Sequence, residues 1–191
     1  KEADQEVFKN IRGSIEQLLK PHEKDFREWD AKGEMPASFL EEIKQFGLFS
    51  LLIPEAHGGM ALSTTAYSRT LQELARYDGS VAVTVGAHSS IGMRGLLLFG
   101  TDEQKAKWCP KLATGEMIAA FCLTEPGAGS DAASIKTTAV LDGDDFVLNG
   151  SKLWITNGGI AQFYTVFAKT GGQAERGHMT AFIVTRDMPG V

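Results

Sequence analysis

The sequence predicts a protein of two parts, an all-α region followed by a small β-barrel or sandwich. Up to about position 116, apolar residues recur at helical spacing between charged ones. From position 117 onward the apolar segments are short and separated by turn residues, which is typical of strands. The 191 residues are enough for two small cores. We therefore expect an N-terminal helical domain at 1–116 and a β-domain at 117–191.

Helices are expected throughout the first part. Apolar residues recur at helical spacing from Val7 to Leu19, and Pro21 interrupts this run. Ser63 and Thr101 are suitable N-cap residues for later helices. Gly47 and the pair at 78–79 are suitable ends for the helices before them. These signals predict further helices at 37–46, 64–77 and 102–113, with a loop at 53–60.

The least polar stretch is 80–100, SVAVTVGAHSSIGMRGLLLFG. It is long enough to span a bilayer. It also contains His88, Arg94 and several glycines, a load that membrane spans rarely carry without a functional cause. We interpret it as one buried helix, with His88 as a hydrogen-bonded core histidine.

Six short strands are expected in the second part. Hairpin-type turn residues stand at 142–144 and 149–150. The last residues, 188–191, are typical of the middle of a loop, so we expect the β-domain to be cut short there. The expected strands are 118–123, 135–141, 145–149, 153–156, 163–169 and 179–185.

Composition excludes several classes of function. The net charge of −5 is spread evenly, so the basic surface that nucleic-acid binding needs is missing and we expect no nucleic-acid partner. The 2 cysteines, Cys109 and Cys122, are too few for a disulfide framework or a zinc site alone. The 4 histidines show no metal-ligand spacing, so no metal is expected. The first residues, 1–5, lead into a charged helical pattern rather than a signal peptide.

Two segments are candidates for a ligand site. The first is FCLTEPGAGSD at 121–131, where a proline and two glycines follow an expected strand. Gly127 and Gly129 allow backbone conformations closed to other residues, and Thr124 and Ser130 add hydroxyl groups. Such a loop could bring N–H groups to a phosphate, or could simply be a tight turn. The pattern is neither a Walker nor a Rossmann motif.

The second segment is NGSKLWITNGG at 149–159. If 153–156 is a strand, Trp154 and Thr156 lie on the same side of it, because side chains alternate. A tryptophan beside a hydroxyl can flank a flat aromatic ligand and bond its edge. The alternative is that Trp154 fills one end of the β-domain core. The residues alone leave both readings open.

Taken together, these segments resemble the acyl-CoA dehydrogenase family along essentially the whole chain. CLTEPGAGSD and NGSKLWITNGG at this separation are the most specific matches. IPEAHGG at 53–59, GTDEQKAKW at 100–108 and KLATGE at 111–116 agree with them. GAHSSIGMRGLLLFG and FCLTEPGAGSDAASIKTTA are most similar to the long-chain and very-long-chain branch.

The resemblance implies a flavin chemistry. Members bind FAD and oxidise a fatty acyl-CoA to the trans-2-enoyl-CoA. A glutamate base takes a proton beside the thioester, flavin N5 takes a hydride, and electrons pass to an electron-transfer flavoprotein. Members are usually homodimers or homotetramers. The expected location is the mitochondrial matrix in a eukaryote and the cytoplasm in a bacterium.

The resemblance also implies site residues. The 121–130 segment would line the FAD, with Thr124 bonding the isoalloxazine and Ser130 meeting both the pyrophosphate and the acyl-CoA. Trp154 and Ile155 would pack on the other flavin face, with the Thr156 hydroxyl near N5. Members often have Tyr where Phe121 stands. The implied FAD-binding residues are Phe121, Cys122, Leu123, Thr124, Gly129, Ser130, Trp154, Ile155 and Thr156.

No catalytic base is expected within 1–191. In the family the glutamate lies in a C-terminal helical domain, to which nothing here corresponds. Glu125 is expected to hold its loop by hydrogen bonds instead. Two alternatives stay open: an acyl-CoA oxidase or flavin monooxygenase of the same fold, or a noncatalytic ligand-binding module if 1–191 is the whole product.

Overall fold

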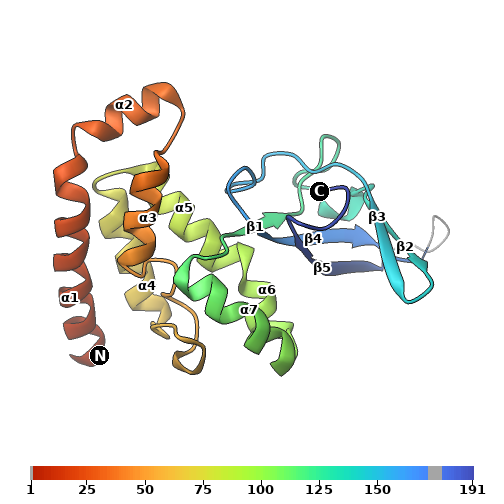
Figure 1. Cartoon of the computed structure of the whole chain (residues 1–191), viewed down its shortest axis with the longest axis horizontal. Coiled ribbons are helices and arrows are strands. Elements are labelled where there is room, and N and C mark those ends of the chain that lie inside the picture. Colours follow the sequence, from red (N-terminus) through yellow and green to blue (C-terminus); the bar gives the residue numbers. More distant parts are fainter. Residues whose placement is uncertain (1, 172–177) are drawn as a thin grey trace.

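The computed structural model describes residues 2–171 and 178–191 and places the helices on one side and the strands on the other (Figure 1). This confirms the predicted order of a helical part followed by a β part. The division at 116/117 stays a prediction; it falls between the last helix and the first strand. The helices are α1 (Glu2–Leu19), α2 (Asp25–Lys32), α3 (Ala37–Gln45), α4 (Thr64–Ala75), α5 (Gly79–Ala87), α6 (Arg94–Phe99) and α7 (Asp102–Thr114).

Helix boundaries follow the local chemistry that the sequence offers. The Ser63 hydroxyl accepts a bond from the Ala66 N–H, as an N-cap residue should. Thr101 and Gln104 form a reciprocal capping box at the start of α7. α1 ends before Pro21, as predicted. Its apolar face is buried in the part of the helix after Val7. The side chain of Val7 itself lies outside the described residues.

Three details of the helical part differ from the prediction. α2 was not predicted, because its eight residues carry little apolar periodicity. Asp78 caps the beginning of α5, accepting a 2.8 Å bond from the Val81 N–H, rather than only ending α4. The expected single helix at 80–100 is broken into α5, a π-helical turn at His88–Gly92, and α6.

The π-helical turn ends where the chain passes close to the first strand. A Cβ atom on Gly92 would lie 2.8–2.9 Å from atoms of Ala119, so the helix approaches the first strand more closely than other residues allow. The whole stretch Gly79–Phe99 is long and apolar enough to cross a membrane, and half of its most apolar window is buried. Here it serves as a core element of the helical domain, as predicted.

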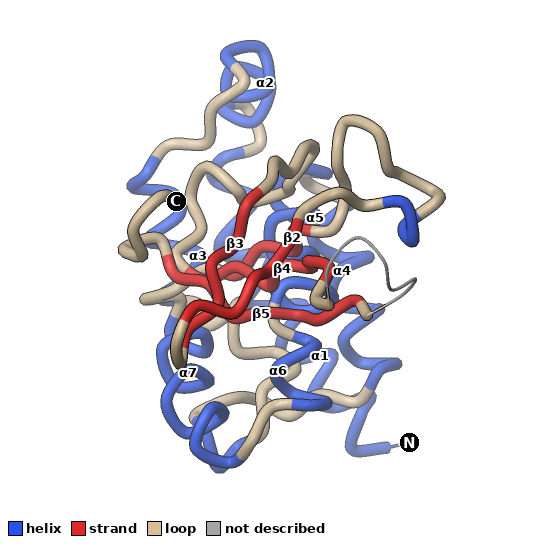
Figure 2. Tube along the Cα trace, turned by 90° about the vertical axis from the view of Figure 1, so that its right-hand side faces the viewer, coloured by secondary structure: helices blue, strands red, loops and turns tan. Residues whose placement is uncertain are grey.

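The sheet is built around β4 (Phe163–Lys169), with β5 (Met179–Thr185) antiparallel along its length. On its other edge, β1 (Ala119–Cys122) pairs in parallel at one end and β2 (Thr138–Asp142) at the other. β2 and β3 (Asp145–Asn149) form the predicted hairpin. Within the described residues the sheet is open rather than a closed barrel, and Figure 2 shows it in front of the helices.

The predicted strand at 153–156 is wrong. These residues form a loop, and Trp154 has a left-handed φ of 59° that no strand contains. The Leu153 N–H bonds the Thr124 carbonyl instead of a strand partner. The turn residues at 149–150 therefore lead into this loop and not into a hairpin. Trp154 and Thr156 consequently do not share a face through strand alternation.

The two domains share a core. Side chains of α6 and α7 pack with Ala119 and Phe163 of the sheet. At this junction the Ala119 N–H donates to His88 Nδ1 at 2.9 Å, and the Thr165 hydroxyl donates to the Gly92 carbonyl at 2.7 Å. His88 is fully buried, which confirms it as a hydrogen-bonded core histidine.

Candidate functional site

The fold brings the two candidate segments side by side, although they are about thirty residues apart in sequence. The Leu153 N–H donates to the Thr124 carbonyl at 2.9 Å. Lys152 Nζ donates to the Leu123 carbonyl at 3.0 Å. The loop that leaves β1 and the loop that carries Trp154 therefore form one continuous surface.

The first residues of the site come from the end of β1. Phe121 is half-buried and meets Phe167 edge to face, with 5.0 Å between ring centroids. Cys122 is buried, and burial raises the pKa of its thiol to about 11, although Lys152 acts in the opposite sense. Cys122 is therefore a packing residue with an unreactive thiol. Leu123 and Thr124 are half-buried and lead into the turn.

The turn itself is closed by backbone bonds. Glu125 and Ala128 exchange two N–H to carbonyl bonds of 3.0 and 3.1 Å. Neither Gly127 nor Gly129 has a positive φ, so the turn does not use the conformational freedom that these glycines allow. A Cβ on either glycine would meet nothing within 4 Å. The tight turn is thus confirmed, and its glycines and exposed Ser130 leave open space where a ligand can approach the backbone.

Trp154 is the most conspicuous side chain of the site. It is 83% exposed, so the reading that it fills the end of a β-domain core is wrong. Its backbone has a left-handed φ of 59°, a conformation that for a bulky residue persists only where the surroundings impose it and that is often found at binding sites. The position of Trp154 therefore fits a flat apolar ligand.

Ile155 and Thr156 line an open groove of about 450 Å³ between their loop and the first turns of α5, where Val83 and Thr84 form the opposite wall. Thr156 is exposed and Ile155 half-buried. Asn157 fixes this loop: its amide donates to the carbonyls of Thr84 at 2.9 Å and Ala119 at 3.4 Å. The groove thus lies where the helical domain meets the β-domain.

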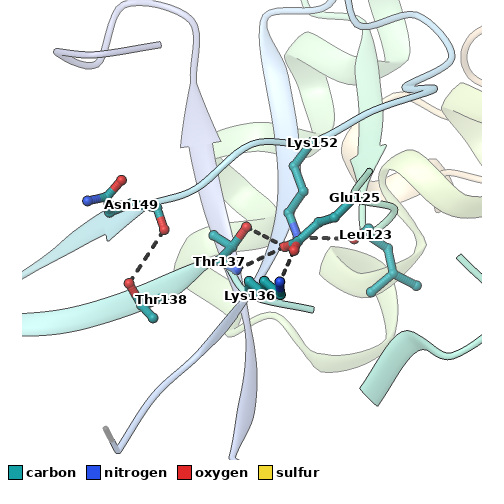
Figure 3. Close-up of polar contacts among 7 residues, drawn as sticks. All are labelled: Leu123, Glu125, Lys136, Thr137, Thr138, Asn149 and Lys152. Atoms are coloured by element: carbon teal, nitrogen blue, oxygen red, sulfur yellow. Dashed lines mark hydrogen bonds and ion pairs between the residues drawn. The ribbon is translucent and has the colours of Figure 1, made fainter. Parts of the chain in front are cut away.

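Glu125 is the centre of a buried polar cluster beneath the two loops (Figure 3). Its carboxylate accepts from the backbone N–H groups of Lys136 and Thr137, from the Thr137 hydroxyl, and from Lys152 Nζ at 2.8 Å. Burial pushes its pKa upward, but the bonds from Lys152 and Thr137 outweigh burial and hold the pKa at about 2. This confirms that Glu125 holds its loop through hydrogen bonds.

Sequence reasoning missed two residues that organise the site. Lys152 and Asn157 both lie inside the NGSKLWITNGG segment, and no spacing rule marked either as important. The sequence did contain a signal for Lys152. It stands between turn residues and an apolar run, and the other candidate segment contains a glutamate that could pair with it. The left-handed φ of 65° at Asn157 is favoured by asparagine.

Comparison with known proteins gives the family. The family model described as "Acyl-CoA dehydrogenase, N-terminal domain" matches residues 1–116. The model described as "Acyl-CoA dehydrogenase, middle domain" matches residues 120–191. The chain therefore belongs to the acyl-CoA dehydrogenase family and spans its N-terminal and middle domains.

Individual relatives agree with this assignment. The mitochondrial very long-chain specific acyl-CoA dehydrogenase of Macaca fascicularis is 46% identical over 190 residues, covering 93% of this chain and 29% of the relative. An acyl-CoA dehydrogenase structure from Geobacillus kaustophilus is 37% identical, with a TM-score of 0.88 over 100% of this chain and 50% of that one. A Bacillus anthracis acyl-CoA dehydrogenase complexed with FAD is 37% identical, with a TM-score of 0.82 over 100% and 32%. The chain thus spans half or less of the length of these relatives.

Proposed function

We propose that the protein carrying this chain is an FAD-dependent acyl-CoA dehydrogenase that converts a long-chain fatty acyl-CoA to the trans-2-enoyl-CoA. The observation that carries the proposal is the 83% exposed Trp154 beside the open groove lined by Thr156. A planar, largely apolar ring system would cover Trp154, and the Thr156 hydroxyl offers a hydrogen bond at the edge of that ring. When bound, FAD supplies the acceptor for the hydride.

The site residues are assigned roles on this basis. Thr124 offers a hydrogen bond to the flavin from the β1 side, and Ser130 offers one to the pyrophosphate and borders the acyl-CoA. Trp154 and Ile155 pack on the opposite flavin face. The remaining proposed FAD contacts come from Phe121, Cys122, Leu123, Gly129 and Thr156.

The base that removes the substrate proton is assigned to a part of the protein outside residues 1–191. Glu125 is unsuited to that role, because the residue is only 7% exposed and its carboxylate oxygens are occupied by four donors. A pKa of about 2 makes it a weak base. In this proposal, residues 1–191 supply part of the FAD site, and another part of the protein supplies the base.

The flavin contact of Trp154 can be tested by FAD titration of the apo full-length protein. Trp154→Ala removes an exposed side chain, so it should leave thermal stability unchanged and weaken FAD binding by about tenfold. Phe99→Ala, which removes the 85% exposed aromatic of α6, is the matched control and should leave FAD affinity unchanged. Unchanged FAD affinity in Trp154→Ala would overturn the proposed contact.

The role of Thr156 separates binding from chemistry. A hydroxyl that stabilises charge arriving on the flavin acts mainly during reduction. Thr156→Val should therefore slow flavin reduction in stopped-flow measurements by about tenfold or more, with a much smaller change in FAD affinity. Equal reduction rates in variant and wild type would remove this role.

Partners and location are proposed from the family. The electron acceptor is an electron-transfer flavoprotein, and the full-length protein is a homodimer or homotetramer. Among its relatives are a mitochondrial protein of an animal and a bacterial protein. We propose the mitochondrial matrix if the source is a eukaryote and the cytoplasm if it is a bacterium.

A further inference from the structure

We propose that Lys152 and Glu125 form a buried ion pair that positions the two flavin-binding loops against each other, so that both are positioning residues for FAD. The inference rests on the proposed function. It assigns a task to two largely buried charged side chains that do not line the groove and that join the two loops.

Lys152 joins its own loop to two residues of the loop after β1. Its Nζ lies 2.8 Å from Glu125 Oε1 and 3.0 Å from the Leu123 carbonyl oxygen, and the side chain is only 11% exposed. Both partners belong to the loop after β1, while Lys152 itself begins the loop that carries Trp154. One ammonium group therefore fixes the distance between the two halves of the site.

Glu125 gives that ammonium a rigid anchor. Its side chain is 6% exposed, and its other bonds come from the backbone N–H groups of Lys136 and Thr137, which directly precede β2, and from the Thr137 hydroxyl. The carboxylate is thus attached to the sheet and cannot follow Lys152 freely. Figure 3 shows Lys152, Thr137, Lys136 and the Leu123 carbonyl converging on this point.

The contact to Leu123 has a consequence for ligand binding. The C=O and N–H groups of a trans peptide point in opposite directions. Because Lys152 draws the Leu123 carbonyl inward, the next N–H, on Thr124, is turned away from the cluster. The Thr124 carbonyl is occupied as well, because it accepts the Leu153 N–H. Two successive carbonyl oxygens of this loop are thus bonded within the protein, while the Thr124 N–H faces away from the Lys152 ammonium.

The same pair bears on Trp154. Trp154 follows Lys152 by two residues and has a left-handed φ of 59°, a conformation that persists only where its surroundings impose it. Lys152 on one side, and Asn157 with its bond to Thr84 on the other, hold the ends of this short loop. Loss of the Lys152 anchor would allow the backbone at Trp154 to relax and its ring to leave the flavin position.

The test is FAD binding by the full-length protein and its variants. Lys152→Met leaves the buried Glu125 carboxylate without its cation. We expect the Kd for FAD to rise by about tenfold or more, with a changed visible flavin spectrum in the fraction that binds. Lys152→Arg keeps the charge and should recover most of the affinity. A purely structural role would lower the melting temperature of the apoprotein and leave the spectrum of bound flavin unchanged.

Two controls make the result specific. Lys111→Met makes the same substitution in an ion pair with Glu116, in which both side chains are about half exposed, and should leave FAD affinity unchanged. The double variant Glu125→Gln/Lys152→Met is uncharged at both positions and guards against misfolding of the single variant. Its loss of FAD affinity should not exceed that of Lys152→Met alone.

Three results would overturn the inference. A folded Lys152→Met with the wild-type Kd and flavin spectrum would show that the pair does not position FAD. A double variant that loses more FAD affinity than Lys152→Met alone would show that the two residues act separately. A wild-type protein that binds no FAD would overturn the proposed function itself, and this inference with it.

Discussion

His88 gives the folded protein a dependence on pH that can be measured directly. Its ring is buried between the two domains, edge-on to Phe49 with 4.9 Å between ring centroids. Its Nδ1 accepts the Ala119 N–H, so the neutral ring carries its proton on Nε2. Burial lowers the pKa of His88 from 6.5 to about 4, while the backbones of Phe49 and Leu112 act in the opposite sense.

The direction and size of the effect follow from this pKa. Because the folded pKa lies below the unfolded one, the unfolded chain binds the proton first as the pH falls, and stability is lost between 6.5 and about 4. The full difference is about 3 kcal/mol. Of this, about 2 kcal/mol should be lost between about pH 7.5 and about pH 5.

The assay is urea unfolding of wild type and His88→Asn across this pH range. Asparagine keeps an oxygen acceptor close to the position of Nδ1 but does not titrate. The variant starts from a lower stability, so the informative quantity is the slope of unfolding free energy against pH. All other titrating groups are common to both proteins and cancel in the difference. Parallel slopes above about pH 5 would refute the assignment of a buried, neutral His88.

Further predictions concern the junction and a helix cap. Asn157→Ala should lower the unfolding free energy, measured in urea, by about 1–3 kcal/mol, because it removes two hydrogen bonds to backbone carbonyls and strains a left-handed φ. Asn157→Gly should lower it less, because glycine adopts this φ without strain. A greater loss in Asn157→Gly would contradict the strain. Gly92→Ala should cost about 1–3 kcal/mol by the same assay because its Cβ would lie 2.8–2.9 Å from Ala119, whereas Gly13→Ala, in open space on α1, should be neutral or stabilising. A Gly92→Ala variant of wild-type stability would exclude the close approach. Thr101→Ala should lower the melting temperature by an amount equivalent to about 1 kcal/mol, the usual value of an N-cap, and an unchanged melting temperature would count against the capping box.

The sequence predicted elements well where local chemistry decides them. Ser63 and Thr101 marked helix starts because a hydroxyl at the N-cap satisfies an otherwise free N–H, whatever the rest of the fold does. β3 and the turn at 142–144 followed from the turn residues on either side of a short apolar segment, and Gly143 has the positive φ of 63° that the turn requires. These features need no knowledge of distant residues.

The errors lie where distant contacts decide the backbone. The apolar run at 80–100 gave no sign of the π-helical turn, which ends where Gly92 lies close to Ala119 of the distant first strand. Residues 153–156 have the composition of a strand, yet the bond from Leu153 to Thr124 takes them out of the sheet. Local propensity is a weak guide when tertiary bonds compete with it.

The candidate site divides in the same way. Its two segments could be selected from sequence because glycines, hydroxyls and a tryptophan gather there. Their mutual position could not, since Lys152 and Glu125 are 27 residues apart and only folding brings their charges within 2.8 Å. The exposure of Trp154 could not be predicted from the sequence either, because the same residue in a closed barrel would have been buried.

The central claim is tested most directly by titrating the FAD-loaded full-length protein with a long-chain acyl-CoA under anaerobic conditions while following the visible flavin absorbance. We predict that the absorbance bleaches as substrate is added, because the substrate gives up a proton and a hydride and the flavin becomes reduced. Bound FAD that keeps its oxidised spectrum at saturating acyl-CoA would contradict the proposed dehydrogenase activity.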